Sequence, residues 1–159
     1  MSHKLSHLDP EGRASMVDVG HKPETERRAV ARGSVMLPEE AFVLARNGDL
    51  KKGDIRAAAE LAGVMAAKNT ADIIPLCHPL LLTYVDVSLS FDDLSSSVEI
   101  EAEVRTTGKT GVEMEALTAV SAAALTVYDM IKAVTKTARI TNIRLVEKEG
   151  GQSGHLILE

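Results

Sequence analysis

Two strictly alternating segments constrain the fold of this chain more than any other feature. Val85 to Phe91 and Val98 to Val104 each place an apolar side chain at every second position, with polar side chains between. This period of two is typical of a strand that is covered on one face. The acidic, serine-rich segment from Asp92 to Ser97 separates them and is short enough to be a hairpin loop. The sequence therefore predicts an antiparallel sheet with one covered face.

Helical patterns lie on both sides of this hairpin. Pro38 and two acids begin the first helix, Asn47-Gly48 ends it, and Asp54 is positioned to cap the second. The expected strands are 27–37, 82–91, 98–104 and 138–146, and the expected helices are 38–47, 54–68 and 112–135. Prolines at 75 and 79 exclude a helix or central strand from 73–80. The order β-α-α-β-β-α-β predicts an α+β, ferredoxin-like sandwich with its helices packed on one face of an antiparallel sheet.

Composition bounds the domain organisation and the class of partner. The 159 residues fit one domain, which we expect at 16–159 after a flexible arm at 1–15 that holds His3 and His7. A formal net charge of −5, with two Phe, two Tyr and no Trp, argues against a nucleic-acid polymer or an anionic membrane as partner. The single cysteine and the lack of a secretory or membrane-spanning pattern favour a cytoplasmic protein.

Gly108-Lys109-Thr110-Gly111 resembles part of a phosphate-binding loop. The full Walker pattern requires a glycine where this chain has Glu103, so a nucleoside-triphosphatase is excluded. The GxxG of a KH module joins two helices, whereas this motif follows a strand. Contact with a phosphate or carboxylate through free amides at a helix start, and a plain strand-to-helix turn, both remain open.

Two further clusters allow both a functional and a structural interpretation. Asp129 and Lys132 lie three residues apart near the end of an apolar helix, which fits a partly buried acid–base pair or an ordinary surface ion pair. Cys77-His78 lies between two prolines. One cysteine is too few for a structural zinc site, so we expect no metal and consider His78 a proton-handling or structural group. Acids at 113 and 115 fit the first turn of a helix.

Five motifs occur together in an order that is much more specific than any one of them. They are MVDV at 16–19, KGD at 52–54, IPLCHPL at 74–80, GKTGVEMEAL at 108–117 and YDMIKAV at 128–134. In this combination the chain closely resembles the MoaC family, the cyclic pyranopterin monophosphate synthases of molybdenum-cofactor biosynthesis. The resemblance covers roughly residues 6–151. Gly20, where the family often has Ser, is a small departure.

The resemblance implies a ferredoxin-like fold and a homo-hexamer built from three dimers. It implies a reaction in which a 3',8-cyclised 7,8-dihydro-GTP nucleotide becomes cyclic pyranopterin monophosphate and pyrophosphate is released. The residues it places in catalysis are Asp129, Lys132 and Lys52. Those it places in substrate contact are Leu76, Cys77, His78, Met114 and Glu115, with Asp18, Lys22, Arg27, Lys109 and Lys148 as further pocket residues. No cofactor is required by this pattern, and Mg²⁺ could accompany the triphosphate.

This chemistry makes two physical demands. A triphosphate requires several cations although the whole chain is acidic, and ring rearrangement requires groups that move protons. We expect Asp129 to hold protons beside a lysine whose pKa is lowered by its cationic neighbours.

Helix geometry adds a constraint on the assembly. Glu115 and Asp129 are 14 residues apart on one expected helix, or about 21 Å at a rise of about 1.5 Å per residue. We therefore expect the site to lie between subunits. A non-catalytic nucleotide sensor is the alternative from another class, because fold alone does not decide function.

Overall fold

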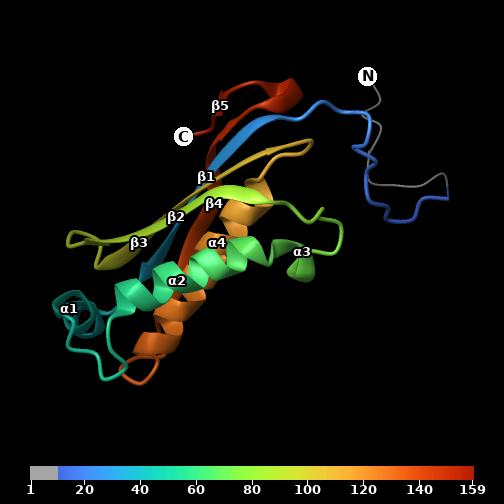
Figure 1. Cartoon of the computed structure of the whole chain (residues 1–159). Coiled ribbons are helices and arrows are strands. Elements are labelled where there is room, and N and C mark those ends of the chain that lie inside the picture. The colour runs from blue at the N-terminus through green and yellow to red at the C-terminus, as the bar shows by residue number, and fades with distance from the viewer. Residues whose placement is uncertain (1–10) are drawn as a thin grey trace.

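The computed structural model describes residues 11–159 and forms one antiparallel sheet with helices on a single face (Figure 1). The helices are α1 (Glu39–Asn47), α2 (Ile55–Lys68), the one-turn α3 (Thr70–Ile73) and α4 (Glu113–Ile131), with a 3-10 turn η1 (Gly151–Ser153). The strands are β1 (Thr25–Met36), β2 (Leu82–Asp92), β3 (Ser97–Gly108), β4 (Arg139–Glu149) and the short β5 (Leu156–Ile157). His3 and His7 lie outside the described residues, and the division into an arm at 1–15 and a domain at 16–159 stays a prediction.

The sheet confirms the predicted α+β, ferredoxin-like architecture. Its strand order is β2-β3-β1-β4-β5, with every neighbouring pair antiparallel. The β2–β3 hairpin pairs Phe91 with Val98 and Val85 with Val104 in the register that the alternation requires. β3 lies between β2 and β1, so the two strands that α1 and α2 connect are not neighbours in the sheet. A β-α-β-β-α-β unit has the same arrangement.

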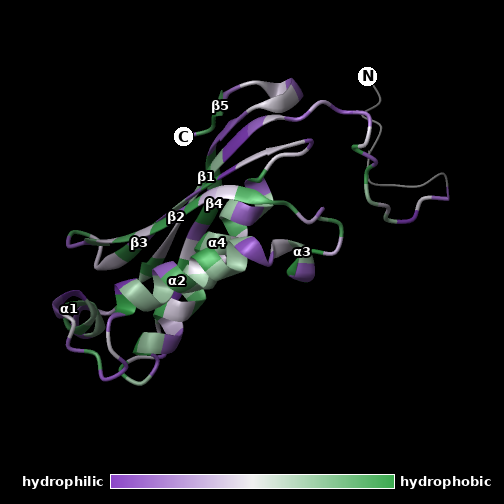
Figure 2. Ribbon diagram, in the orientation of Figure 1, coloured by the Kyte–Doolittle hydropathy of each residue, from purple (hydrophilic) through white to green (hydrophobic). Residues whose placement is uncertain are grey.

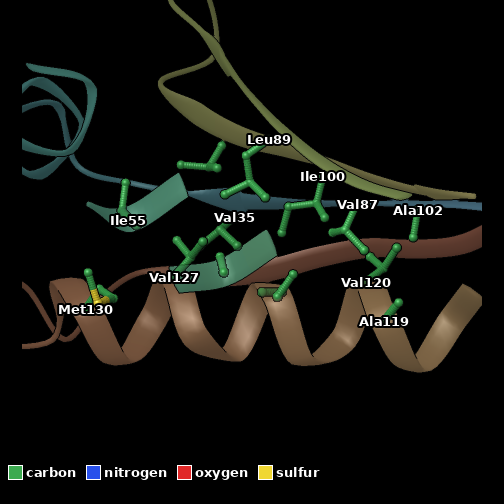
Figure 3. Close-up of a cluster of buried hydrophobic side chains, with 14 of the residues drawn as sticks. Val35, Ile55, Val87, Leu89, Ile100, Ala102, Ala119, Val120, Val127 and Met130 are labelled. Atoms are coloured by element: carbon green, nitrogen blue, oxygen red, sulfur yellow. The ribbon is translucent and has the colours of Figure 1, made fainter. Parts of the chain in front are cut away.

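The covered face of the sheet packs on α4 and α2 to form the core. Val35, Ile100, Val120 and Val127 lie between sheet and helix and are at most 2 % exposed (Figure 3). Alanines at 116, 119, 123 and 124 are fully buried along α4 and allow the helix to approach closely. Figure 2 shows the two helices as largely apolar beneath the sheet. α4 is long and apolar enough for a membrane span, but half of it is buried against this fold. It is therefore the core helix.

Local signals set the ends of α1 and α2 as predicted. Asp54 Oδ1 accepts hydrogen bonds from the amides of Arg56 at 2.8 Å and Ala57 at 3.2 Å, which caps α2. Gly48 ends α1 in the left-handed conformation, with a φ of 77°. Gly63 lets α2 approach its neighbours, since an added methyl group would lie 3.0 Å from Val87 Cγ1.

The end of α4 was predicted incorrectly. The expected helix continues to Thr135, whereas α4 ends at Ile131 and the amides of Val134 and Thr135 both turn back to the Ile131 carbonyl. No Gly or Pro marks this stop, and apolar Val134 continues the periodic pattern beyond it. Lys132 consequently caps the helix, and its side chain leaves from the helix end.

Candidate active site

The last turn of α4 carries a carboxylate that two lysines contact. Asp129 Oδ1 lies 2.6 Å from Lys132 Nζ, and Asp129 Oδ2 lies 2.7 Å from Lys52 Nζ. Lys52 comes from the loop between α1 and α2 and also donates to the backbone carbonyl of Asp129 at 2.7 Å. The structure thus brings together the three residues expected in catalysis, although Lys52 lies 77 positions away from Asp129 in sequence.

The electrostatics of this cluster decide between two alternatives that the sequence left open and contradict one expectation. The Asp129 side chain is 54 % exposed in the single chain, so the pair is a surface ion pair there and not a partly buried one. The ammonium of Lys132, and next that of Lys52, lowers the pKa of Asp129 to about 2. Asp129 in turn raises the pKa of Lys132, opposite to the expected lowering. At neutral pH the single chain therefore holds Asp129 ionised and Lys132 protonated.

A cavity of about 260 Å³ lies at the other end of α4. It is formed where the irregular segment before β1, the proline-bracketed loop after α3 and the start of α4 meet. Six of the expected substrate-contacting and pocket residues line it: Lys22, Leu76, Cys77, His78, Met114 and Glu115. The remaining lining residues are Val17, Val19, Leu80, Thr110, Gly111 and Glu113.

Glu115 is the buried acid of this cavity. Its side chain belongs to a residue that is only 4 % exposed, and burial raises its pKa, with a smaller contribution from the negative charge of Glu113. Burial likewise raises the pKa of the Cys77 thiol, and the Glu115 charge adds to that effect. Cys77 is therefore kept as a neutral thiol and is not an activated nucleophile.

The strand-to-helix loop at 108–111 holds the segment before β1. Lys109 Nζ donates to the Gly20 carbonyl at 2.7 Å, and Asp18 Oδ1 accepts from the Gly20 amide at 2.8 Å. The amide of Lys22 closes the same turn on the Val19 carbonyl at 3.0 Å. Lys109 and Asp18 thus shape the wall that carries Lys22, while neither is among the residues that line the cavity.

Lys148 and Arg27 lie beside this region and are held differently. Lys148, on β4, forms an ion pair with Glu113 of the cavity wall. Arg27, on β1, donates through Nε to the Gly108 carbonyl at 3.3 Å and lines a different cavity of about 660 Å³. Glu113 also lines the cavity of Glu115, and the sequence did not single it out because an acid in a first helical turn looks like a dipole partner.

No three His, Cys, Asp or Glu side chains within residues 11–159 are grouped to hold a metal ion. The cavity instead offers one buried acid, one imidazole, one thiol and a lysine. The described part of the chain is therefore equipped for acid–base and electrostatic chemistry at two separate places. These places lie at opposite ends of α4, 14 residues or about 21 Å apart along its axis.

Comparison with known proteins gives a consistent result. The sequence model of the MoaC family matches residues 16–151. A cyclic pyranopterin monophosphate synthase of Heliobacterium modesticaldum is 60 % identical over 155 residues, which is 98 % of each chain. The synthase of Roseiflexus castenholzii is 59 % identical and that of Natranaerobius thermophilus 49 %, each again covering 98 % of both chains. Because the family model matches most of the chain and relatives are 49–60 % identical over nearly its whole length, the chain belongs to the MoaC family.

Proposed function

We propose that the chain is a cyclic pyranopterin monophosphate synthase of molybdenum-cofactor biosynthesis. Its substrate would be the 3',8-cyclised 7,8-dihydro-GTP nucleotide and its products cyclic pyranopterin monophosphate and pyrophosphate. The observation that carries this proposal is the clustering of six expected site residues around one cavity, with a buried acid in its wall. Nearly full-length relatives that are named for this activity support it.

The cavity supports recognition and rearrangement of the ring system. A buried carboxyl whose pKa is raised by burial can exchange protons with a bound ring, and the His78 imidazole lines the same cavity. Proton transfer suffices for this rearrangement, which requires neither an external oxidant nor a reductant. Glu115 and His78 are thus the groups proposed to exchange protons with the ring.

The second part of the reaction is closure of the cyclic phosphate. A sugar hydroxyl attacks the α-phosphorus, a P–O bond forms, and the bond to the β-phosphate breaks to release pyrophosphate. Lys132, kept protonated by Asp129, can stabilise the charge that develops on the phosphate oxygens or donate a proton. Any Mg²⁺ would enter with the triphosphate, since Asp129 and Glu113 are already engaged by lysines. No resident cofactor is proposed.

The two clusters form one site if different subunits supply them. One nucleotide hardly spans about 21 Å along a single helix, and the Asp129 cluster is exposed in the single chain. We therefore propose a homo-hexamer, a trimer of dimers, with sites at subunit interfaces. The cytoplasm is the proposed compartment.

Turnover of the cyclised nucleotide tests the proposed function. Purified protein should form the cyclic phosphate product and release pyrophosphate in equal amounts. Asp129→Ala should lower kcat/KM by about 10²- to 10⁴-fold, as expected for a residue that controls proton transfer. Asp93→Ala is the matched control, because Asp93 is also an exposed aspartate in an ion pair, at 3.0 Å from Arg46. If the wild-type protein binds the cyclised nucleotide tightly but does not convert it, the result would favour a nucleotide sensor and contradict the proposed enzymatic function.

A further inference from the structure

Two consecutive glycines after β4 form a turn that only glycine adopts without strain. Gly150 has a φ of 99° and Gly151 a φ of 71°. The turn closes when the Gly150 amide donates to the Gly154 carbonyl at 3.0 Å. It follows the strand that carries Lys148, so it lies at the same end of the sheet as the cavity that contains Glu115.

The backbone of this turn packs against the Arg27 side chain. A methyl group at Gly151 would overlap Nη1 of Arg27 and lie 2.7 Å from its Cζ. A methyl group at Gly150 would overlap the Glu26 carbonyl and lie 3.1 Å from Arg27 Cδ. On the β3 side, Arg27 Nε donates to the Gly108 carbonyl at 3.3 Å. The guanidinium is thus held between the Gly150-Gly151 turn and Gly108, and a side chain at Gly151 would require the guanidinium to move.

The charge of Arg27 is left available, in contrast to its neighbour. Arg28 forms ion pairs with Glu103 and Glu147, both at 2.8 Å. Within residues 11–159, no carboxylate forms an ion pair with Arg27. β1 pairs Ala29 with Lys148, so the two-residue period places Arg27 and Lys148 on the same face of the sheet. A fixed, unneutralised guanidinium is suited to bidentate recognition of phosphate oxygens.

We infer that Gly151 is a positioning residue, which leaves the space that fixes the Arg27 guanidinium for contact with the polyphosphate of the substrate. This inference rests on the proposed function, because it takes the triphosphate as the anion. Gly151 itself touches no reacting atom. Gly151 affects substrate binding only through the position of Arg27. An experiment that removes Arg27 can therefore distinguish this positioning role from a purely structural one.

The test compares two glycines that both have a positive φ but differ in their surroundings. Gly154 has a φ of 64°, close to that of Gly151, but an added methyl group there meets nothing within 4 Å. Gly151→Ala should raise KM for the cyclised nucleotide, and the inhibition constant of added pyrophosphate, by about 10- to 100-fold, the loss of a charge-assisted hydrogen bond. Gly154→Ala also places a side chain at a positive φ but displaces no guanidinium, so it should change both constants less than about twofold.

A double substitution separates positioning from structure. In an Arg27→Ala background, Gly151→Ala should raise KM no further than Gly154→Ala does, because the guanidinium it displaces is absent. If Gly151→Ala raises KM in the Arg27→Ala background as much as it does in the wild type, the inference is overturned. Equal KM values for Gly151→Ala and Gly154→Ala, measured beside an active wild type, would also overturn it. An inactive wild type would instead overturn the proposed function. If Gly151→Ala does not fold, Arg27→Lys decides: it keeps the charge but loses the planar edge, so an unchanged KM would overturn the inference.

Discussion

Asp129 and Glu115 are carboxylic acids on one helix whose surroundings move their pKa values in opposite directions. Two ammonium groups contact Asp129 and lower its pKa to about 2, whereas burial raises that of Glu115. Asp129 is therefore ionised at every pH above about 4, so it is a fixed negative charge in the single chain. Glu115 is the acid that environment adapts for proton exchange nearer neutral pH. Local surroundings thus assign different roles to the same chemical group.

The Asp129 cluster yields a prediction about which lysine dominates. Lys132 contributes more than Lys52 to the lowered pKa of Asp129. Lys132→Met should therefore raise that pKa more than Lys52→Met does. A pH titration of the side-chain carboxyl carbon by NMR measures both shifts. Lys51→Met is the control, because the neighbouring lysine is exposed and should leave the titration unchanged. A larger shift in Lys52→Met would contradict this ordering.

Glu115 yields a prediction about stability and pH. Its pKa is raised in the folded chain, so the unfolded chain loses this proton at lower pH and the folded state is penalised as pH rises through that range. Glu115→Gln should raise the melting temperature at pH 8 and leave it nearly unchanged at pH 4, while activity falls. Thermal melts at the two pH values measure this.

Glu113→Gln provides the contrast for that experiment. It removes the partner of Lys148 rather than a buried unpaired charge, so it should not stabilise the chain at pH 8. Stabilisation by Glu115→Gln of equal size at both pH values would contradict the assignment, because packing alone would then explain it.

Among the helices and strands, sequence patterns predicted the features that depend on neighbouring residues and did not predict those that depend on distant contacts. Alternation predicted the β2–β3 hairpin, and Asp54 and Gly48 predicted where α2 begins and α1 ends. The end of α4 could not be predicted, because its stop follows from the geometry of the next loop and not from a Gly or Pro. The one-turn α3 and the two-residue β5 carry too few residues for a periodic signal.

The cap of α2 gives a prediction at this scale. Asp54→Ala removes the acceptor for two amides and should lower the free energy of unfolding by about 1 kcal/mol. Asp54→Ser should restore most of it, because its hydroxyl can accept the same bonds. Urea denaturation measures both. Equal stability of Asp54→Ala and wild type would show that α2 is held by packing alone.

The site was predictable only in part, again for a physical reason. The five ordered motifs identified Asp129, Lys52 and the cavity residues through the resemblance, whereas spacing alone could not join Lys52 to a residue 77 positions away. The sequence could not decide between an exposed and a partly buried Asp129, and the raised pKa of Lys132 follows from its close contact with that carboxylate. The Glu113–Lys148 ion pair could not be predicted either, because it depends on how β4 lies relative to the start of α4.

Across the whole molecule, some basic side chains form ion pairs with glutamates and others have no carboxylate partner among the described residues. Arg28 and Arg32 pair with glutamates of β3 across the sheet, and Arg105 pairs with Glu103 on β3 itself. Among residues 11–159, Lys22 and Arg27 have no carboxylate partner, and both lie near the 108–111 loop. An acidic protein can thus present a local positive field to a polyphosphate. The Asp129 cluster remains at the far end of α4, and the proposed assembly joins it to this field.

Subunit complementation tests that joint site most directly. Asp129→Ala and Glu115→Ala chains, each inactive alone, are mixed, dissociated and reassembled, and mixed oligomers are verified by mass spectrometry with two different tags. If the two ends of α4 serve one site across an interface, some sites in mixed oligomers contain both intact residues, and turnover of the cyclised nucleotide returns to roughly a quarter of the wild-type rate by random pairing in dimers. Verified mixed oligomers with no recovered turnover would contradict the shared site.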